Sequence, residues 1–462
     1  MKNCSVKQKG MRISNTRIFT HGSILFILLW TAGGCSGNFL LTDNNSRNNI
    51  ASGTDYTSFT YDGAWCWFSD PRAVYYEGEH RRTYAGWISS SGDIEVGFYD
   101  HDTGKIKTEV IISDFPADDH NNPSILIKPD GKLLVFYSEH ATEKPMYLRR
   151  STNPEDISMW EPVEKLNLNN SKRYQGFSDT YTYTNPIYLK DEQKLYLFWR
   201  GSDFKPNYAF SEDWGKSWSR GEILILPDRT YRNRRPYLKV ASNGKDEIHF
   251  AFSQGHPRRE PDNSIYYMSY KDGAYWHADG TKITDTLSKP SEVDLVYDAT
   301  NSPRAWVWDV AVDQSGKPAI VYATFPDDTT HIYHYAKWDG SSWQNYKLVD
   351  SGLWFPDTPE SEQEPEPNYS GGISLDHENP NIVYLSRQRR GVFEIEKWVT
   401  HDGGKSWERN IVTSGSSFDN VRPVAVRNAE QGNSLQFLWM LNEEYIHYTD
   451  YNSVIKMNLT GR

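Results

Sequence analysis

Four side chains that can do acid–base and electrostatic chemistry lie within one stretch of the chain, residues 118–200. His120 and His140 bracket a short apolar run. Tyr183 follows in a polar run, and Arg200 ends the next apolar run. Histidine and tyrosine can take or give a proton, and arginine can hold a carboxylate through paired hydrogen bonds. Together, the four could remove a carbon-bound proton, protonate a leaving oxygen and neutralise a carboxylate.

Each of these residues alone is more often a surface or core side chain than a catalyst. Their density favours a site, because two histidines that bracket one hairpin can share one rim of a fold. The proline after Asn185 forces an extended turn beside Tyr183, and Tyr181 lies two residues away as the alternative tyrosine.

The elements that must position these residues are strands. Short alternating runs occur at residues 82–88, 132–137, 194–199 and 319–323, and many adjoin Asp-Gly or Ser-Gly turns that signal hairpins. Aromatic residues make up 14% of the 462 residues, which suits β-structure. We find no long amphipathic helix, so the sequence predicts an all-β protein.

Repeats indicate the architecture. Residues 211–218 and 400–407 both fit the Asp-box pattern Ser/Thr-x-Asp-x-Gly-x-Ser/Thr-Trp, and residues 271–276 and 338–343 are degenerate copies. In this pattern the aspartate caps a tight turn, the glycine supplies a positive φ and the tryptophan packs under the hairpin. Such boxes mark propeller blades of roughly 40–60 residues. Residues 56–462 are therefore predicted to form one seven-bladed β-propeller.

The N-terminus predicts export. Residues 1–35 hold basic residues, a short apolar run and small residues before Cys35, which resembles a lipoprotein box. Residues 36–55 read as a flexible tether. We expect an outer-membrane lipoprotein that faces the periplasm or the cell surface, with an ordinary cleaved signal as the alternative. Cys66 would then be the cysteine left inside the fold, so no intrachain disulfide is expected.

The net charge of −11 argues against a nucleic-acid partner, since phosphate binding needs a basic surface. An anionic ligand would need local arginine clusters, such as those within residues 232–235, 258–259 and 387–390. We expect a monomer that meets a membrane through its lipid anchor alone.

Several motifs resemble one family. They are the run 63–74 (GAWCWFSDPRAV), residues 82–87, 119–124, 183–186, 255–258 and 279–281. Together they resemble the BNR-repeat propeller proteins of polysaccharide-degrading bacteria, closest to the seven-bladed ulvan lyases and their relatives that act on rhamnose–glucuronate linkages. The resemblance covers nearly everything after Tyr56.

The resemblance implies a lyase that breaks the bond at C4 of a uronic acid by removing the C5 proton. The family's two histidines, tyrosine and arginine fall on His120, His140, Tyr183 and Arg200. We expect His120 as the base, Tyr183 as the acid and an alternative base, and His140 and Arg200 as neutralisers of the substrate carboxylate. The C5 proton lies on opposite faces of glucuronic and iduronic acid, so the base can differ between them.

Further residues are candidates for contacts to the substrate or to a structural ion. Asn185, Arg235, His256 and Arg304, with Arg232, are candidate substrate contacts, and Trp306 and Trp308 are either sugar platforms or inner-strand packing. β-Elimination with arginine neutralisation requires no metal. Related lyases carry a structural ion, however, and one could be assembled from Cys66 and histidines of the later blades, namely His256, His277, His331, His334 and His377. No compact ligand spacing supports it.

Two other functions stay open. Some relatives are exo-acting α-L-rhamnosidases that remove rhamnose from glucuronic acid with a histidine on the other face of the propeller, and His80 falls near that position. The third reading is a glycan-binding lipoprotein without catalysis.

Overall fold

Strands form where apolar and polar residues alternate between turn signals. In the computed structural model, β3 (Arg81–Ile88), β7 (Leu133–Tyr137), β11 (Lys194–Arg200) and β21 (Pro318–Asp327) cover the four runs that the sequence marks. All five residues of β7 are buried, as expected for a strand covered on both faces.

The structure describes residues 56–227, 234–286, 289–327, 329–353, 371–430 and 432–459. The predicted signal, lipoprotein box and tether lie outside these ranges and stay predictions, as does the candidate contact Arg232. Within the described residues there is no α-helix, and the helical segments are the short 3-10 turns η1 (Asp119–Asn121), η2 (Ser202–Phe204) and η4 (Pro290–Glu292). No helical segment in this part of the chain has the length and hydropathy needed to cross a membrane.

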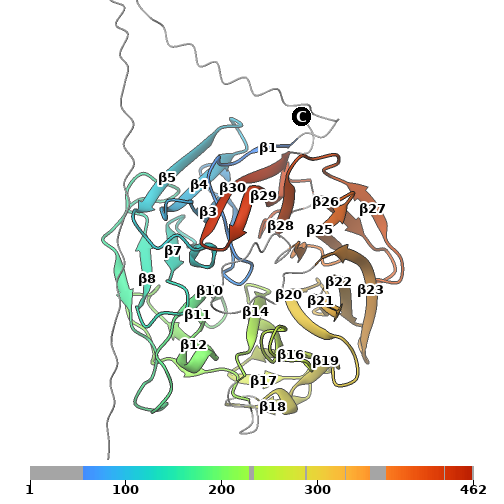
Figure 1. Ribbon diagram of the computed structural model, residues 1–462. Coiled ribbons are helices and arrows are strands. Elements are labelled where there is room, and N and C mark those ends of the chain that lie inside the picture. The colour runs from blue at the N-terminus through green and yellow to red at the C-terminus, as the bar shows by residue number, and fades with distance from the viewer. Residues whose placement is uncertain are drawn as a thin grey trace, which may run out of the picture. The chain divides into compact units, whose positions relative to one another are not determined.

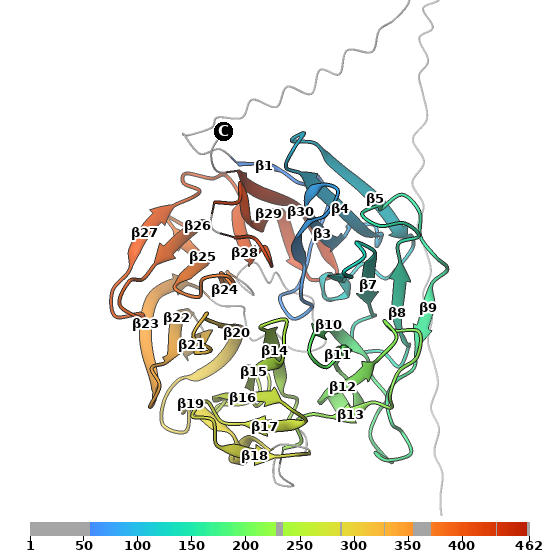
Figure 2. The same cartoon turned by 180° about the vertical axis from the view of Figure 1, so that it is seen from behind.

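The strands form seven antiparallel sheets, which confirms the seven-bladed propeller (Figures 1 and 2). The blades are: blade 1, β2 (Ala73–Glu77), β3, β4 (Ile94–Asp100) and β5 (Ile106–Ile112); blade 2, β6 (Ser124–Ile127), β7, β8 (Met146–Arg150) and β9 (Glu164–Leu166); blade 3, β10 (Thr182–Leu189), β11, β12 (Pro206–Ser211) and β13 (Glu222–Ile223); blade 4, β14 (Tyr237–Ser242), β15 (Glu247–Ser253), β16 (Ile265–Lys271), β17 (Ala274–Trp276), β18 (Lys282–Thr284) and β19 (Asp294–Tyr297); blade 5, β20 (Arg304–Val312), β21, β22 (Thr330–Trp338) and β23 (Trp343–Gly352); blade 6, β24 (Ile373–Leu375), β25 (Ile382–Arg389), β26 (Val392–Val399) and β27 (Glu408–Ile411); blade 7, β28 (Asp419–Ala425), β29 (Leu435–His447), β30 (Asp450–Leu459) and β1 (Tyr56–Ser58).

Blade 7 closes the ring by joining the two ends of the propeller sequence. The N-terminal strand β1 pairs with the C-terminal strand β30, and Tyr56 lies opposite Asn458. Closure matters because a ring of sheets otherwise leaves open edges between its first and last blades.

The Asp boxes form the predicted turns, between the third and fourth strands of their blades. In the second box, Asp402 accepts hydrogen bonds from Ser406 and Thr400, and the indole of Trp407 donates to the carbonyl of Gly404 at 3.0 Å. Trp407 also packs edge-on against Tyr335 of the neighbouring blade, with ring centroids 5.1 Å apart. The boxes therefore tie blades together and lie away from the candidate catalytic residues.

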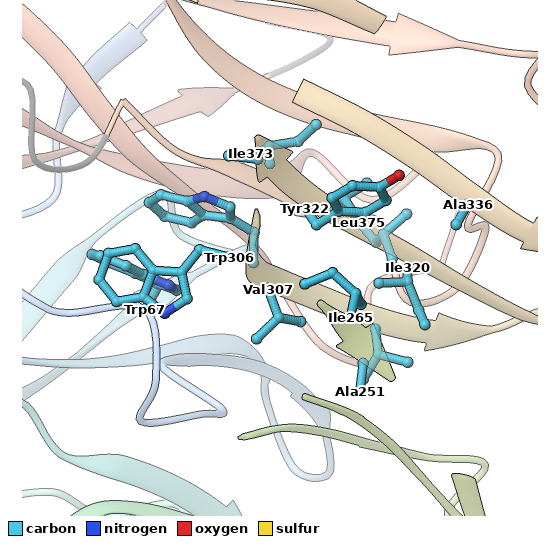
Figure 3. Close-up of a cluster of buried hydrophobic side chains, with 14 of the residues drawn as sticks. Trp67, Ala251, Ile265, Trp306, Val307, Ile320, Tyr322, Ala336, Ile373 and Leu375 are labelled. Atoms are coloured by element: carbon cyan, nitrogen blue, oxygen red, sulfur yellow. The ribbon is translucent and has the colours of Figure 1, made fainter. Parts of the chain in front are cut away.

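The largest buried cluster runs through blades 4 to 6 and the channel (Figure 3). Trp306 is 1% exposed and lies 5.1 Å from Trp67, while Trp308 stacks on Trp67 at 4.0 Å. Trp306 and Trp308 therefore pack in the core, and inner-strand packing was one of the two roles predicted for them.

The innermost strands all run in one direction, and this gives the ring two distinct faces. We call the end at which they begin, as at Ser124 of β6 and Thr182 of β10, the top face, and the other end the bottom face. Second strands such as β7 and β11 end at the top face because each pairs antiparallel with its innermost strand.

The second Asp box allows a matched test of packing. An added Cβ at Gly404 would lie 2.7 Å from atoms of both Tyr335 and Tyr346, whereas one at Gly403 would meet nothing within 4 Å. Both glycines have a positive φ, 104° and 73°, so Gly403→Ala should cost about 1 kcal/mol through strain alone. Gly404→Ala should cost about 1–3 kcal/mol more through overpacking. Urea unfolding measures the difference, and equal losses would contradict this packing.

Candidate active site

Asp118 joins the two predicted histidines at the top face. It caps η1, and its Oδ1 accepts hydrogen bonds from the backbone N–H of His120 and from the ring Nδ1 of the same residue, at 2.9 and 2.8 Å. Its Oδ2 lies 3.0 Å from Nδ1 of His140. A carboxylate only accepts, so both Nδ1 atoms carry hydrogen. Asp118 therefore fixes the orientation of both rings through their Nδ1 atoms.

The two imidazoles form a parallel stack, with centroids 4.1 Å apart and planes 10° apart. Burial opposes charge on His120, yet the nearby Cys66 and then the carboxylates of Asp118 and Asp119 raise the pKa of this imidazole well above its usual value. Burial, and then the neighbouring His120, lower the pKa of His140 to about 4. Near neutral pH the pair therefore holds one imidazolium, His120, and one neutral imidazole, His140.

Tyr183 faces this pair because the backbone bends at that point. Its φ is +62°, a left-handed value that a tyrosine rarely adopts. The pairing of β10 with β11 shifts register between Thr182 and Asn185, as in a bulge that re-aims a side chain. The Tyr183 ring lies 5.9 Å from His120 and 6.3 Å from His140.

Tyr181 lies elsewhere, which separates the two candidate tyrosines. Its ring packs in the core between blades 2 and 3, and its hydroxyl accepts a hydrogen bond from the backbone N–H of Asn169 at 2.9 Å. Tyr183 is thus the tyrosine at the histidine pair.

Arg200 ends β11 beside Tyr183. The guanidinium carbon lies 4.8 Å from the Tyr183 ring centre, and Nη1 donates to the hydroxyl of Tyr237 at 2.9 Å. Arg200 is only 6% exposed. The structure thus brings all four predicted catalytic residues together at adjacent blades of one face.

The predicted substrate contacts divide into two groups. Arg235 is exposed and lies 3.9 Å over the Phe204 ring, which Arg200 also contacts. Burial, and then the nearby Arg200, lower the pKa of Arg235. His256 packs against Trp306 at 4.6 Å, and Arg304 opens β20 at the same face. These three could contact a bound anion.

Asn185 has a different role from the predicted one. Its amide nitrogen donates to the carbonyls of Phe68 and Tyr183, at 2.9 and 3.0 Å, and its oxygen accepts from the backbone N–H of Asp70 at 3.1 Å. Both ends of the amide are bound to the main chain, so Asn185 braces the bend at Tyr183 instead of offering itself to a ligand.

Blade 7 contributes residues that sequence reasoning missed. Tyr448, between β29 and β30, lies edge-on to both imidazoles, 4.7 Å from His120 and 5.5 Å from His140. Its carbonyl accepts the backbone N–H of Asp119 at 2.8 Å. Below them, Arg422 pairs with Asp119. No local motif signals these residues, because they reach the site from the far end of the sequence.

His80 lies in the turn between β2 and β3, at the bottom face. Its backbone N–H donates to the Glu155 carboxylate at 3.0 Å. The bottom mouth of the channel holds a cavity of about 460 Å³, lined mainly by innermost strands, and His80 is not among its lining residues. The alternative catalytic residue therefore does not line this cavity.

Four of the later-blade histidines bond separate partners within the described residues. His277 bonds Asp294, His331 the carbonyl of Gly352, His334 Thr324 and His377 Asp309. Among the residues described, the one group of three side chains whose ligand atoms lie within 4.8 Å of one another is Asp118, His120 and His140. Their N···O distances of 2.8 and 3.0 Å fit direct hydrogen bonds, so we assign them as a hydrogen-bonded group and not as metal ligands.

The charge states of the two histidines can be measured directly. We expect the His120 signal to stay in its imidazolium position as the pH rises past 6.5, because two carboxylates hold the charge. The His140 signal should stay neutral until the pH falls to about 4. A pH titration of histidine 13Cε1 resonances, assigned by His→Gln variants, checks this. Two titrations near pH 6.5 would contradict the assignment.

Comparisons with known proteins agree with the fold. A curated PL25 ulvan lyase from Pseudoalteromonas sp. (strain PLSV) is 22% identical over 388 residues, covering 70% of this chain and 71% of that protein. A PL25 ulvan lyase solved bound to -[GlcA(1-4)Rha3S]- superposes with a TM-score of 0.66 at 18% identity, covering 87% of this chain and 95% of that one. The solved polysaccharide lyase Uly1 superposes with a TM-score of 0.54 at 12% identity, covering 87% and 98%.

A family model gives the assignment. The model described as BNR repeat-containing family member matches residues 82–351, more than half of the chain and nearly all of blades 1 to 5. The match includes all four candidate catalytic residues. This protein belongs to the BNR repeat-containing family.

Proposed function

We propose that this protein is a polysaccharide lyase that cleaves rhamnose–uronic acid linkages by β-elimination. The observation that carries the proposal is the convergence of two imidazoles, a tyrosine and a guanidinium at one face of the channel, with one imidazole charged and the other neutral. Elimination at a uronate needs this combination of positive charge, base and acid.

Positive charge would act on the substrate carboxylate. The C5 proton of a uronate is weakly acidic until the adjacent carboxylate is neutralised. Arg200 and the imidazolium of His120 would bind that carboxylate and stabilise the enolate-like charge that develops on it. Both groups are buried, which strengthens such an interaction relative to water.

The charge states favour exchanging the roles of base and neutraliser that the sequence predicts for His120 and His140. From sequence we expected His120 as the base and His140 as a neutraliser. A base must be unprotonated, and His140 is the imidazole whose pKa lies low. We therefore propose His140 as the histidine base and His120 as a neutraliser, with Asp118 fixing both rings through their Nδ1 atoms.

Each proton and electron pair has a destination in this scheme. The base takes the C5 proton, and the C5–H electron pair forms the C4–C5 double bond. The C4–O bond breaks with its pair on the leaving oxygen, to which Tyr183 gives a proton. Where the C5 proton lies on the face of Tyr183, the tyrosinate could serve as base as well, as in the choice between glucuronic and iduronic acid.

The surroundings support an anionic polymer as substrate. Arg235 lies beside Arg200 on the Phe204 ring and is exposed, so it could bind a further carboxylate or sulfate. The relative solved with -[GlcA(1-4)Rha3S]- bound supports the rhamnose–glucuronate choice. An exported lipoprotein anchored through Cys35 would meet such a polymer outside the cytoplasm.

Product chemistry separates this function from its rivals. With a rhamnose–glucuronate oligosaccharide, the protein should generate an unsaturated uronate that absorbs in the ultraviolet. Tyr183→Phe should lower kcat by about 10²–10⁴-fold, because the acid is lost. Tyr181→Phe removes a buried hydroxyl two residues away and should stay close to the wild type.

Other outcomes would count against the proposal. Release of free rhamnose without ultraviolet absorbance, abolished by His80→Ala, would indicate the rhamnosidase. Binding without any product, unchanged in Tyr183→Phe, would indicate a glycan-binding protein. Equal activity of Tyr181→Phe and Tyr183→Phe would remove Tyr183 from the mechanism.

Metal removal tests the source of the positive charge. Because Arg200 and His120 supply it, dialysis against a chelator should leave the rate within about twofold of the untreated enzyme. Loss of activity that a divalent cation restores would show that a metal neutralises the carboxylate instead.

A further inference from the structure

Arg422 of β28 lies beneath the histidine pair and is 1% exposed. Its φ is +50°, a value rarely adopted by residues other than glycine, so the surrounding structure holds it there. Nη1 donates to the carbonyl of Trp65 at 2.6 Å, and Nη2 donates to the hydroxyl of Tyr445 at 2.7 Å. Nη1 also donates to the carboxylate of Asp119.

Asp119 links this arginine to His120. Its Oδ2 takes hydrogen bonds from both Arg422 and Tyr445. Its Oδ1 lies 3.0 Å from Nδ1 of His120. The backbone of Asp119 is held as well, since its carbonyl accepts the N–H of Cys66 at 2.9 Å. The carboxylate is fully buried, so it keeps its charge only while Arg422 compensates it.

The charges beneath the site balance. Arg422 and His120 are positive, and Asp118 and Asp119 are negative. Burial raises the pKa of the Cys66 thiol, the third acidic group beside His120. If Arg422 were neutral, the buried Asp119 carboxylate would take up a proton, and His120 would lose one of the two carboxylate charges beside it. The pKa of His120 would then fall.

We propose that Arg422 and Tyr445 of blade 7 are positioning residues, which act through Asp119 to keep the imidazole of His120 charged and correctly oriented. This inference rests on the proposed lyase function for its effect on rate, but its effect on His120 can be observed without any turnover. The titratable and charged groups around His120 come from several elements: Asp118 and Asp119 at η1, His140 after β7, Tyr183 in β10, Cys66 before β2, Arg200 at the end of β11, His256 after β15, and Arg422, Tyr445 and Tyr448 from blade 7.

The experiment compares four variants by His120 13Cε1 titration and by the pH profile of kcat/KM. Asp119→Asn removes the negative charge of residue 119 directly, and Arg422→Met removes it because the uncompensated Asp119 carboxylate takes up a proton. Each variant should therefore lower the pKa of His120 by about one unit or more. The alkaline limb of kcat/KM should move down in pH by a similar amount. Tyr445→Phe removes one hydroxyl and serves as the mild variant if Arg422→Met unfolds. It should lower kcat with KM nearly unchanged.

Arg72→Met is the matched control. Arg72 is also a buried arginine, 3% exposed and paired with an aspartate, Asp70, at 3.0 Å. It lies outside the group around His120, so its loss should reduce stability without moving the His120 titration or the alkaline limb.

The two claims fail in different ways. An inactive wild type whose His120 pKa still falls in Asp119→Asn and Arg422→Met would overturn the lyase function and leave the positioning role standing. An active wild type whose His120 titration is the same in folded Asp119→Asn, Arg422→Met and Arg72→Met would overturn the positioning role.

Discussion

The hydrogen bonds of Asp118 to both imidazoles are the interaction on which the rest of the site depends. One carboxylate fixes the orientation of both rings and the tautomer of His140, and the rings can then stack at 4.1 Å. Two positive charges at that separation repel strongly, so the stack divides into one charged and one neutral ring. A single aspartate thereby creates two different chemical groups from two identical side chains.

The difference in charge between His120 and His140 also explains how blade 7 affects a site on blade 2. Burial favours a neutral ring at His120, and the carboxylates of Asp118 and Asp119 both oppose it. Asp119 supplies the second of these carboxylates, and Arg422 stabilises its buried charge. Arg422 sits in the blade that β1 closes, so ring closure and the charge of His120 depend on the same part of the fold. The cost is a left-handed backbone at Arg422 and another at Tyr183.

Much of this could be predicted from sequence, for local reasons. Asp boxes and turn signals predict hairpins of propeller blades, and the length of the chain after the tether, at roughly 40–60 residues a blade, predicts seven of them. His120 and His140 could be recognised because they flank one hairpin. The charge of His120 could not be predicted in full, because one of its causes, the Asp119 carboxylate, is paired with a residue 303 positions away. The choice of Tyr183 over Tyr181 depends on a bulge and a positive φ, which no residue pattern signals. The main-chain partners of Asn185, Phe68 and Asp70, could not be predicted, because they come from a segment more than 100 positions away.

The measurement that tests the central claim most directly is a crystal structure of Tyr183→Phe with a rhamnose–glucuronate oligosaccharide bound. The account predicts the sugar at the top face, with the uronate carboxylate within hydrogen-bonding distance of Arg200 and His120. The C5 atom should face Nε2 of His140 or the ring of residue 183. Sugar bound instead in the cavity at the bottom face, with the histidine pair unoccupied, would contradict it.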